Sequence, residues 1–94
     1  QYPKYPATLS NLGYLYLVMD NDSIAAAKMY NRALALDPDY AQAIMNKAGL
    51  FMLQGKEKEA QLLLKRYLKQ KPDDSTVTEM LRQIMSTTSN GKKK

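Results

Sequence analysis

The sequence contains no cysteine and no histidine. Their absence excludes disulfides, thiol chemistry, the commonest zinc ligands and a histidine general base. No apolar run approaches the ~18 residues needed to span a bilayer, and this stretch carries no signal peptide. We therefore expect no membrane segment. The compartment stays open, with a soluble, cytoplasmic protein slightly favoured.

Titratable groups do not converge on a catalytic site. Asp20 and Asp22 lie in one predicted turn, and Asp73 and Asp74 lie in another. Paired acids at helix starts usually act as caps and as partners of the helix dipole. The serines have no base to activate them, and neither a phosphate-binding glycine loop nor an EF-hand spacing is present. We therefore expect a chain that is not an enzyme and that binds no cofactor or metal.

The net charge of +5 is concentrated at the carboxyl end. Without Lys92, Lys93 and Lys94 the net charge is about +2. The remaining basic residues alternate with acids, as in residues 56–59, which is typical of a solvated helix face. Because the sequence has no basic stripe with interleaved aromatic residues, it argues against a nucleic-acid partner.

A repeat of 34 to 35 residues is the most informative pattern in the chain. Pro3, Pro38 and Pro72 are separated by 35 and 34 residues, and apolar positions such as Leu9 and Ile44 match at the same offset. Self-similarity at this period is the signature of a helical repeat array. Such arrays present a curved surface that usually holds another polypeptide.

Apolar spacing and helix-breaking residues predict an all-α fold. Asp22 or Ser23 is expected to cap the second helix, and Gly55 to end the third in the left-handed conformation. Thr76 and Glu79 are spaced as a capping box for the fifth helix. The expected helices cover about residues 7–19, 23–36, 39–54, 56–70 and 75–86.

Small residues mark the expected crossing points of antiparallel helices. Gly13 should face Ala26 and Ala48 should face Ala60, so that each pair approaches to ~8–9 Å. Arg82 occupies the equivalent position of the fifth helix. Since no sixth helix follows, we interpret the fifth helix as a cap that closes the stack.

These residues resemble the tetratricopeptide repeat, a 34-residue helix–turn–helix unit. The resemblance implies a right-handed helical solenoid of two helix–turn–helix repeats with a C-terminal capping helix. Lys47 and Tyr67 depart from the pattern, because a leucine and a small alanine are usual there. The matching residues are Leu12, Gly13, Tyr16, Ala26, Tyr30, Ala33 and Pro38 in the first unit, and Ala48, Phe51, Gly55, Ala60 and Pro72 in the second.

The resemblance also predicts how the chain is divided. The predicted parts are a remnant of a preceding repeat at 1–5, repeat one at 6–40, repeat two at 41–74, the capping helix at 75–87 and a disordered basic tail at 88–94. Because the chain opens at the end of a repeat, we expect it to be a piece of a longer protein. The alternative is a short natural protein with a tyrosine-rich lead-in.

In tetratricopeptide arrays the first helix of each unit lines the concave face, and the resemblance implies the same here. This floor is mainly apolar, with methionines and a tyrosine that adapt to the shape of a partner. Leu17, Met52 and Leu53 fit core packing as well as they fit binding. The inward positions are Ser10, Tyr14, Leu17, Val18, Gln42, Met45, Asn46, Gly49, Met52, Leu53, Thr76, Glu79, Met80 and Gln83.

The resemblance therefore implies a non-catalytic scaffold for protein–protein interaction that binds a peptide or helix in an apolar concave groove. The alternative is structural packing or self-association within a larger multidomain protein, including an enzyme that uses the array to present substrates. Self-association into a homodimer is expected at the N-terminal end. There Tyr2, Tyr5, Leu9 and part of Leu12 or Tyr16 should form an exposed apolar patch.

Overall fold

The computed structural model describes the backbone of residues 4–92 and the side chains of residues 4–87. All regular structure in that part of the chain is helical, which confirms the all-α prediction. No helix within it is both long and apolar enough to cross a membrane. The helices are α1 (Pro6–Asp20), α2 (Ser23–Leu36), α3 (Ala41–Leu53), α4 (Glu57–Gln70) and α5 (Ser75–Lys92).

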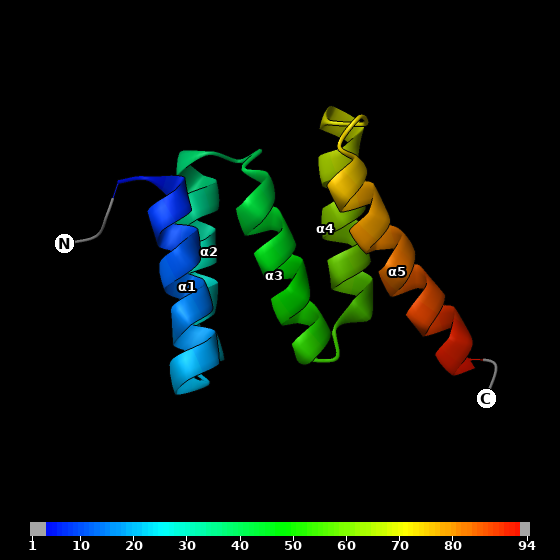
Figure 1. Ribbon diagram of the computed structural model, residues 1–94, viewed down its shortest axis with the longest axis horizontal. Coiled ribbons are helices and arrows are strands. Elements are labelled where there is room, and N and C mark those ends of the chain that lie inside the picture. Colours follow the sequence, from blue (N-terminus) through cyan, green and yellow to red (C-terminus); the bar gives the residue numbers. More distant parts are fainter. Residues whose placement is uncertain (1–3, 93–94) are drawn as a thin grey trace.

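The helices form two layers, with α1, α3 and α5 in the front layer of Figure 1 and α2 and α4 behind them. Each helix packs against the next one along the chain, and α3 also contacts both α1 and α5. Over the described residues, no Cα atom of α2 comes within 8 Å of a Cα atom of α4. Because the front helices approach one another more closely than the back helices do, the array curves with its front layer on the concave side.

Local side chains set the turns between the helices. The Oδ1 atom of Asp22 accepts a hydrogen bond from the backbone N–H of Ala25 at 2.9 Å, so the predicted cap of α2 is confirmed. Asn21 and Gly55 take left-handed backbone conformations with φ of 51° and 74°, as helix ends require. The helix α3 begins at Ala41, two residues later than expected, after the turn that carries Pro38.

The predicted capping box of α5 is wrong. Asp74 caps this helix, since its Oδ1 atom accepts the backbone N–H of Val77 at 3.1 Å. Its Oδ2 atom accepts the hydroxyl of Tyr67, on α4, at 2.7 Å. This hydrogen bond, together with burial, raises the pKa of Tyr67 to about 12, and the same bond lowers the pKa of Asp74. Asp74 therefore ties the end of α4 to the start of α5, while Glu79 pairs with Arg82 instead.

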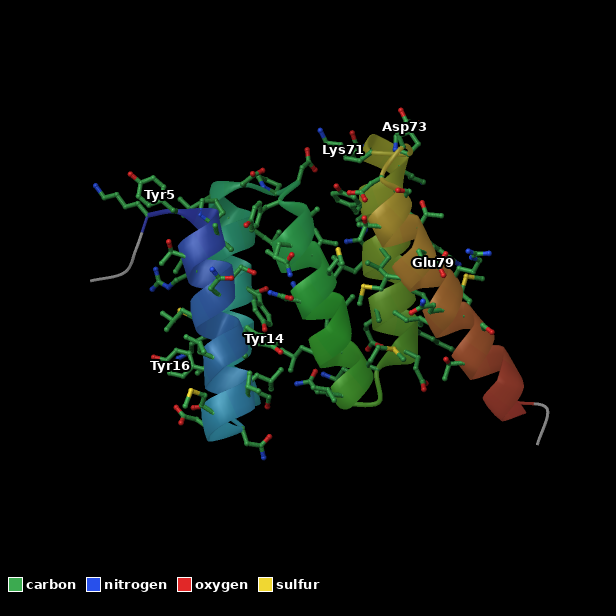
Figure 2. All side chains as sticks on the ribbon, in the orientation of Figure 1. Tyr5, Tyr14, Tyr16, Lys71, Asp73 and Glu79 are labelled. Carbon is green, nitrogen blue, oxygen red and sulfur yellow. The ribbon has the colours of Figure 1, made fainter. Side chains whose placement is uncertain are left out.

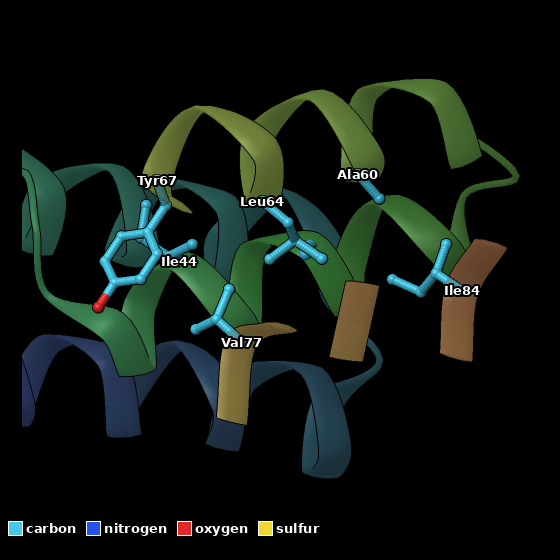
Figure 3. Close-up of a cluster of buried hydrophobic side chains, with 7 residues drawn as sticks. Ile44, Ala60, Leu64, Tyr67, Val77 and Ile84 are labelled. Atoms are coloured by element: carbon cyan, nitrogen blue, oxygen red, sulfur yellow. The ribbon is translucent and has the colours of Figure 1, made fainter. Parts of the chain in front are cut away.

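The core consists of three adjoining clusters that share α3. Ala43 of α3 packs in one cluster and Leu50 in another, both against the first repeat. Ile44 and Ala48 belong to a third cluster with residues of α4 and α5, shown in Figure 3. The helix α3 therefore buries one face against each neighbouring unit. The third cluster comprises Ile44, Ala48, Ala60, Leu64, Tyr67, Val77 and Ile84.

The predicted close approach of helices at small residues is confirmed. A Cβ atom built on Gly13 would lie 2.7 and 2.9 Å from ring carbons of Tyr30 and 3.1 Å from the carbonyl oxygen of Ala26. No real Cβ contact is that short, so only glycine fits at this crossing. Ala48 and Ala60 are both fully buried in the same cluster.

The two departures from the repeat pattern are absorbed in different ways. Lys47 is partly buried and places its Nζ atom 5.9 Å from the ring centre of Phe51, which is within cation–π range. Tyr67 is not accommodated by loose packing, because its side chain is only 7% exposed and belongs to the third cluster. Its hydroxyl reaches the edge of the core, where Asp74 accepts it.

Two further expectations are corrected. Leu9 is only 1% exposed and packs with Met29, Ala33 and Ala43, so it cannot anchor an exposed N-terminal patch. The helix α5 continues to Lys92, so the expected disorder is wrong for residues 88–92. Once a helix is nucleated, each added residue gains a backbone hydrogen bond, and polar composition alone does not stop it. Tyr2 and the last two lysines lie outside the described residues.

Candidate functional site

The concave layer combines exposed, partly buried and fully buried predicted site residues. Tyr14, Val18, Gln42, Leu53, Thr76, Glu79 and Gln83 are exposed. Leu17, Met45, Asn46, Gly49, Met52 and Met80 are partly buried, and Ser10 is fully buried. All of these residues belong to α1, α3 and α5, so the helices of one layer carry them all. Figure 2 shows Tyr14 projecting from α1 on the side that faces α3, and Glu79 on α5.

Ser10 is not available to a partner, because its residue surface is fully buried. The Nδ2 atom of Asn46 donates a hydrogen bond to the Ser10 hydroxyl oxygen at 2.8 Å. The Nε2 atom of Gln42 donates in turn to the Asn46 Oδ1 atom at 3.0 Å. The prediction that Ser10 is a surface contact is therefore wrong. Ser10 instead fixes the orientation of Asn46, which orients the exposed amide of Gln42.

The methionines of the concave layer pack against the core. Met45, Met52 and Met80 are partly buried and pack against the third core cluster. Leu17 packs against the cluster that contains Tyr30. Leu17 and Met52 therefore pack against the core and remain partly exposed, and whether they also bind a partner stays a prediction. Leu53 differs from both, because its side chain is 73% exposed.

Gly49 has open space around the position of its missing side chain. A Cβ atom built on Gly49 would meet no other atom within 4 Å. The equivalent test at Gly13 gives severe overlap, so the two glycines have opposite surroundings. Gly49 lies on α3, the helix of the layer that contacts both α1 and α5. The layer therefore offers open space at its middle.

The concave face carries little uncompensated charge at Glu79. Arg82 and Gln83 both donate hydrogen bonds to the carboxylate of Glu79, the second at 3.3 Å. The bond from Arg82 lowers the pKa of Glu79 and leaves that carboxylate ionised but neutralised by its neighbour. Within residues 4–92 no cluster of three or more acids, histidines or cysteines could hold a metal ion. The surface suits a partner with apolar side chains and amide hydrogen bonds more than a highly charged one.

A second hollow, which the sequence did not predict, lies between α2 and α4 in the back layer. It has a volume of about 310 Å³. The buried Ile44 and the exposed Arg66 are among its lining residues. Apolar spacing alone did not predict this hollow, because it depends on the separation between α2 and α4. Its lining residues are Leu34, Pro38, Asp39, Ile44, Leu63, Arg66, Tyr67 and Gln70.

Comparison with known proteins agrees with the helical repeat fold. The tetratricopeptide repeat family matches residues 17–84 of the chain. The chain is 31% identical over 85 residues to anaphase-promoting complex subunit 7 of Arabidopsis thaliana, covering 90% of this chain and 15% of that protein. It is 35% identical over 85 residues to protein O-mannosyl-transferase TMTC1 of Mus musculus, covering 87% of this chain and 9% of that protein. No solved structure matches significantly.

Proposed function

Because the chain belongs to the tetratricopeptide repeat family, we propose that its concave face holds a peptide or helix of another protein. Members of this family generally mediate protein–protein interaction, and the unit itself is a non-catalytic fold. Binding at the concave face is supported by the open space over Gly49, with exposed Tyr14 and Leu53 in the same layer. An apolar side chain of a peptide or helix can approach the backbone of α3 at this residue, because no side chain of Gly49 stands in its way.

The polar groups of the same face indicate the chemistry of the partner segment. Gln42 is held in place by Asn46 through its Nε2 atom, so its Oε1 atom is left to accept a hydrogen bond from a partner. Glu79 already accepts two intrachain hydrogen bonds and therefore has little capacity left for a cation. We infer a partner segment that is apolar, uncharged at its centre and able to donate an amide N–H to Gln42.

The test uses peptides selected against the chain from a random library, with affinity measured by calorimetry. Gly49→Phe fills the open space and should weaken binding at least tenfold while the protein stays folded. Ala35→Phe is the matched control, because Ala35 is an exposed small residue on α2 in the other layer. Equal affinity of the selected peptides for Gly49→Phe and for the wild type would overturn the proposal.

A second candidate is self-association through the outer face of α1. It is favoured by Leu15 and Met19, which take the place of Leu9 as exposed apolar residues at that end; Met19 is 76% exposed. The chain spans only 15% and 9% of the length of the two relatives. Their greater length favours a related role, in which the array packs against another domain of a larger protein, including an enzyme such as a transferase. Leu15→Ser with Met19→Ser should abolish any dimer formed this way, as judged by sedimentation equilibrium. A dimer of unchanged strength would refute it.

A further inference from the structure

The hollow between α2 and α4 has a preformed apolar lining. We call it the back hollow; its volume is about 310 Å³. Two of its lining residues, Ile44 and Tyr67, are almost fully buried members of the third core cluster in Figure 3. Leu34 of α2 and Leu63 of α4 also line it and pack against the same cluster. Because the core holds these residues in place, the back hollow can receive an apolar side chain of a partner without rearrangement.

Two charged residues line the back hollow without neutralising each other. Arg66 lies on α4 and Asp39 in the turn between α2 and α3, and both are exposed. Among the residues that the structure describes, neither side chain forms an ion pair or a side-chain hydrogen bond. The guanidinium of Arg66 is therefore free to bind both oxygens of a carboxylate that a partner brings to the hollow.

The exposed charge around Arg66 has a single sign. Residues 24–36 of α2 and 60–70 of α4 contain five exposed bases and no acid. The acids of α4, Glu57 and Glu59, are confined to its first turn, about two turns from Arg66. Over residues 6–20, 41–53 and 75–87, by contrast, the front layer has two acids and two bases. The back layer is therefore the basic side of the array. Its five bases are Lys28, Arg32, Lys65, Arg66 and Lys69.

We propose that the back hollow takes an apolar side chain from an acidic segment of another protein, with a carboxylate of that segment on Arg66. Such a segment matches both the apolar lining and the positive charge around it. A nucleic acid fits less well, because Tyr30 and Tyr67 are the only aromatic residues of α2 and α4 and both are buried, which leaves no ring for base stacking. Asp39 would repel a carboxylate, so the acids of the segment lie on the Arg66 side of the hollow. This surface belongs to the other layer, and the proposal is independent of binding at the concave face.

The test uses a synthetic peptide with a central leucine, two glutamates on each side and blocked ends. It is titrated to millimolar concentration into the isotope-labelled intact chain, and backbone amide shifts are followed by nuclear magnetic resonance. The shifts should centre on Leu34, Leu63 and Arg66, and added salt should weaken binding. A peptide with serine in place of the leucine should bind about tenfold more weakly, because it leaves the hollow unfilled. Equal affinity of the two peptides, tighter binding of an oligothymidylate of the same charge, or no shift at these residues would overturn the proposal.

Matched variants separate a specific contact from net charge. Arg66→Glu should weaken binding of the leucine peptide about tenfold. Arg82→Glu makes the same change of charge at an exposed arginine of the front layer and should leave the affinity nearly unchanged. Asp39→Asn should tighten binding, because it removes a repelling carboxylate. Circular dichroism checks that each variant is folded. Equal losses for the two arginine variants, or weaker binding by Asp39→Asn, would contradict the proposal.

Discussion

Replacement of each of two helical glycines by alanine should affect the melting temperature differently. Gly13 lies inside α1 and Gly49 lies inside α3. Alanine is favoured over glycine inside a helix by about 0.5–1 kcal/mol. At Gly49 the new methyl group meets no atom within 4 Å, so the full gain in folding stability from helix propensity is expected. With about 4–8 °C per kcal/mol for a domain of this size, Gly49→Ala should melt about 2–8 °C above the wild type.

At Gly13 the same methyl group would collide with the ring of Tyr30 at 2.7 Å and with the carbonyl oxygen of Ala26 at 3.1 Å. Tyr30 is itself almost fully buried, so its ring cannot swing away. Overpacking of this kind costs about 1–3 kcal/mol, which offsets or exceeds the gain in helix propensity. Gly13→Ala should therefore melt at least about 4 °C below Gly49→Ala in parallel thermal unfolding followed by circular dichroism. Equal melting temperatures would refute the assignment of Gly13 to the helix crossing and of Gly49 to the open groove.

Other expected outcomes concern the core, the caps and pH. Ala26→Leu and Ala60→Leu should each lower the melting temperature by several degrees, because both alanines are fully buried and overpacking costs about 1–3 kcal/mol. Asp22→Ala should destabilise the chain by about 0.5–2 kcal/mol in urea unfolding, since it removes the cap of α2. Tyr67→Phe should lose about 0.5–1.5 kcal/mol at neutral pH through its missing hydrogen bond to Asp74. That bond holds the pKa of Asp74 below 3.8, so its stabilisation is complete above this pH and is lost as the pH falls through the lower folded pKa. The acid-induced loss should be smaller in Tyr67→Phe, and an identical acid profile for both proteins would count against the Asp74 contact.

The arrangement of the helices was predictable because it depends on local signals and on the repeat period. Gly13 and Ala26 identified the crossing in the first repeat, since only small residues permit close approach there. Gly55 marked a left-handed turn by its lack of a side chain. Within the candidate site, Tyr14 is exposed on α1 as expected for a contact residue, whereas Leu53, which the sequence left open between core packing and binding, is also exposed. Their binding of a partner stays a prediction.

The sequence could not reveal features that depend on distances between units. Ser10 has the register of a groove residue, and only the approach of α1 to α3 buries it beneath Asn46. Tyr67 and Asp74 belong to different helices, so their hydrogen bond depends on how the intervening turn folds. Leu9 was expected in an exposed patch at the N-terminal end of the array, whereas its side chain points into the array and packs with Met29, Ala33 and Ala43.

The most direct test of the proposed function is to map the binding surface by nuclear magnetic resonance. The isotope-labelled chain is titrated with the peptide that bound most tightly in the library selection, and backbone amide shifts are followed. The account predicts changes centred on Tyr14, Gly49 and Leu53, in the layer of α1, α3 and α5. Changes centred instead on Leu34 and Arg66, around the hollow between α2 and α4, would contradict it.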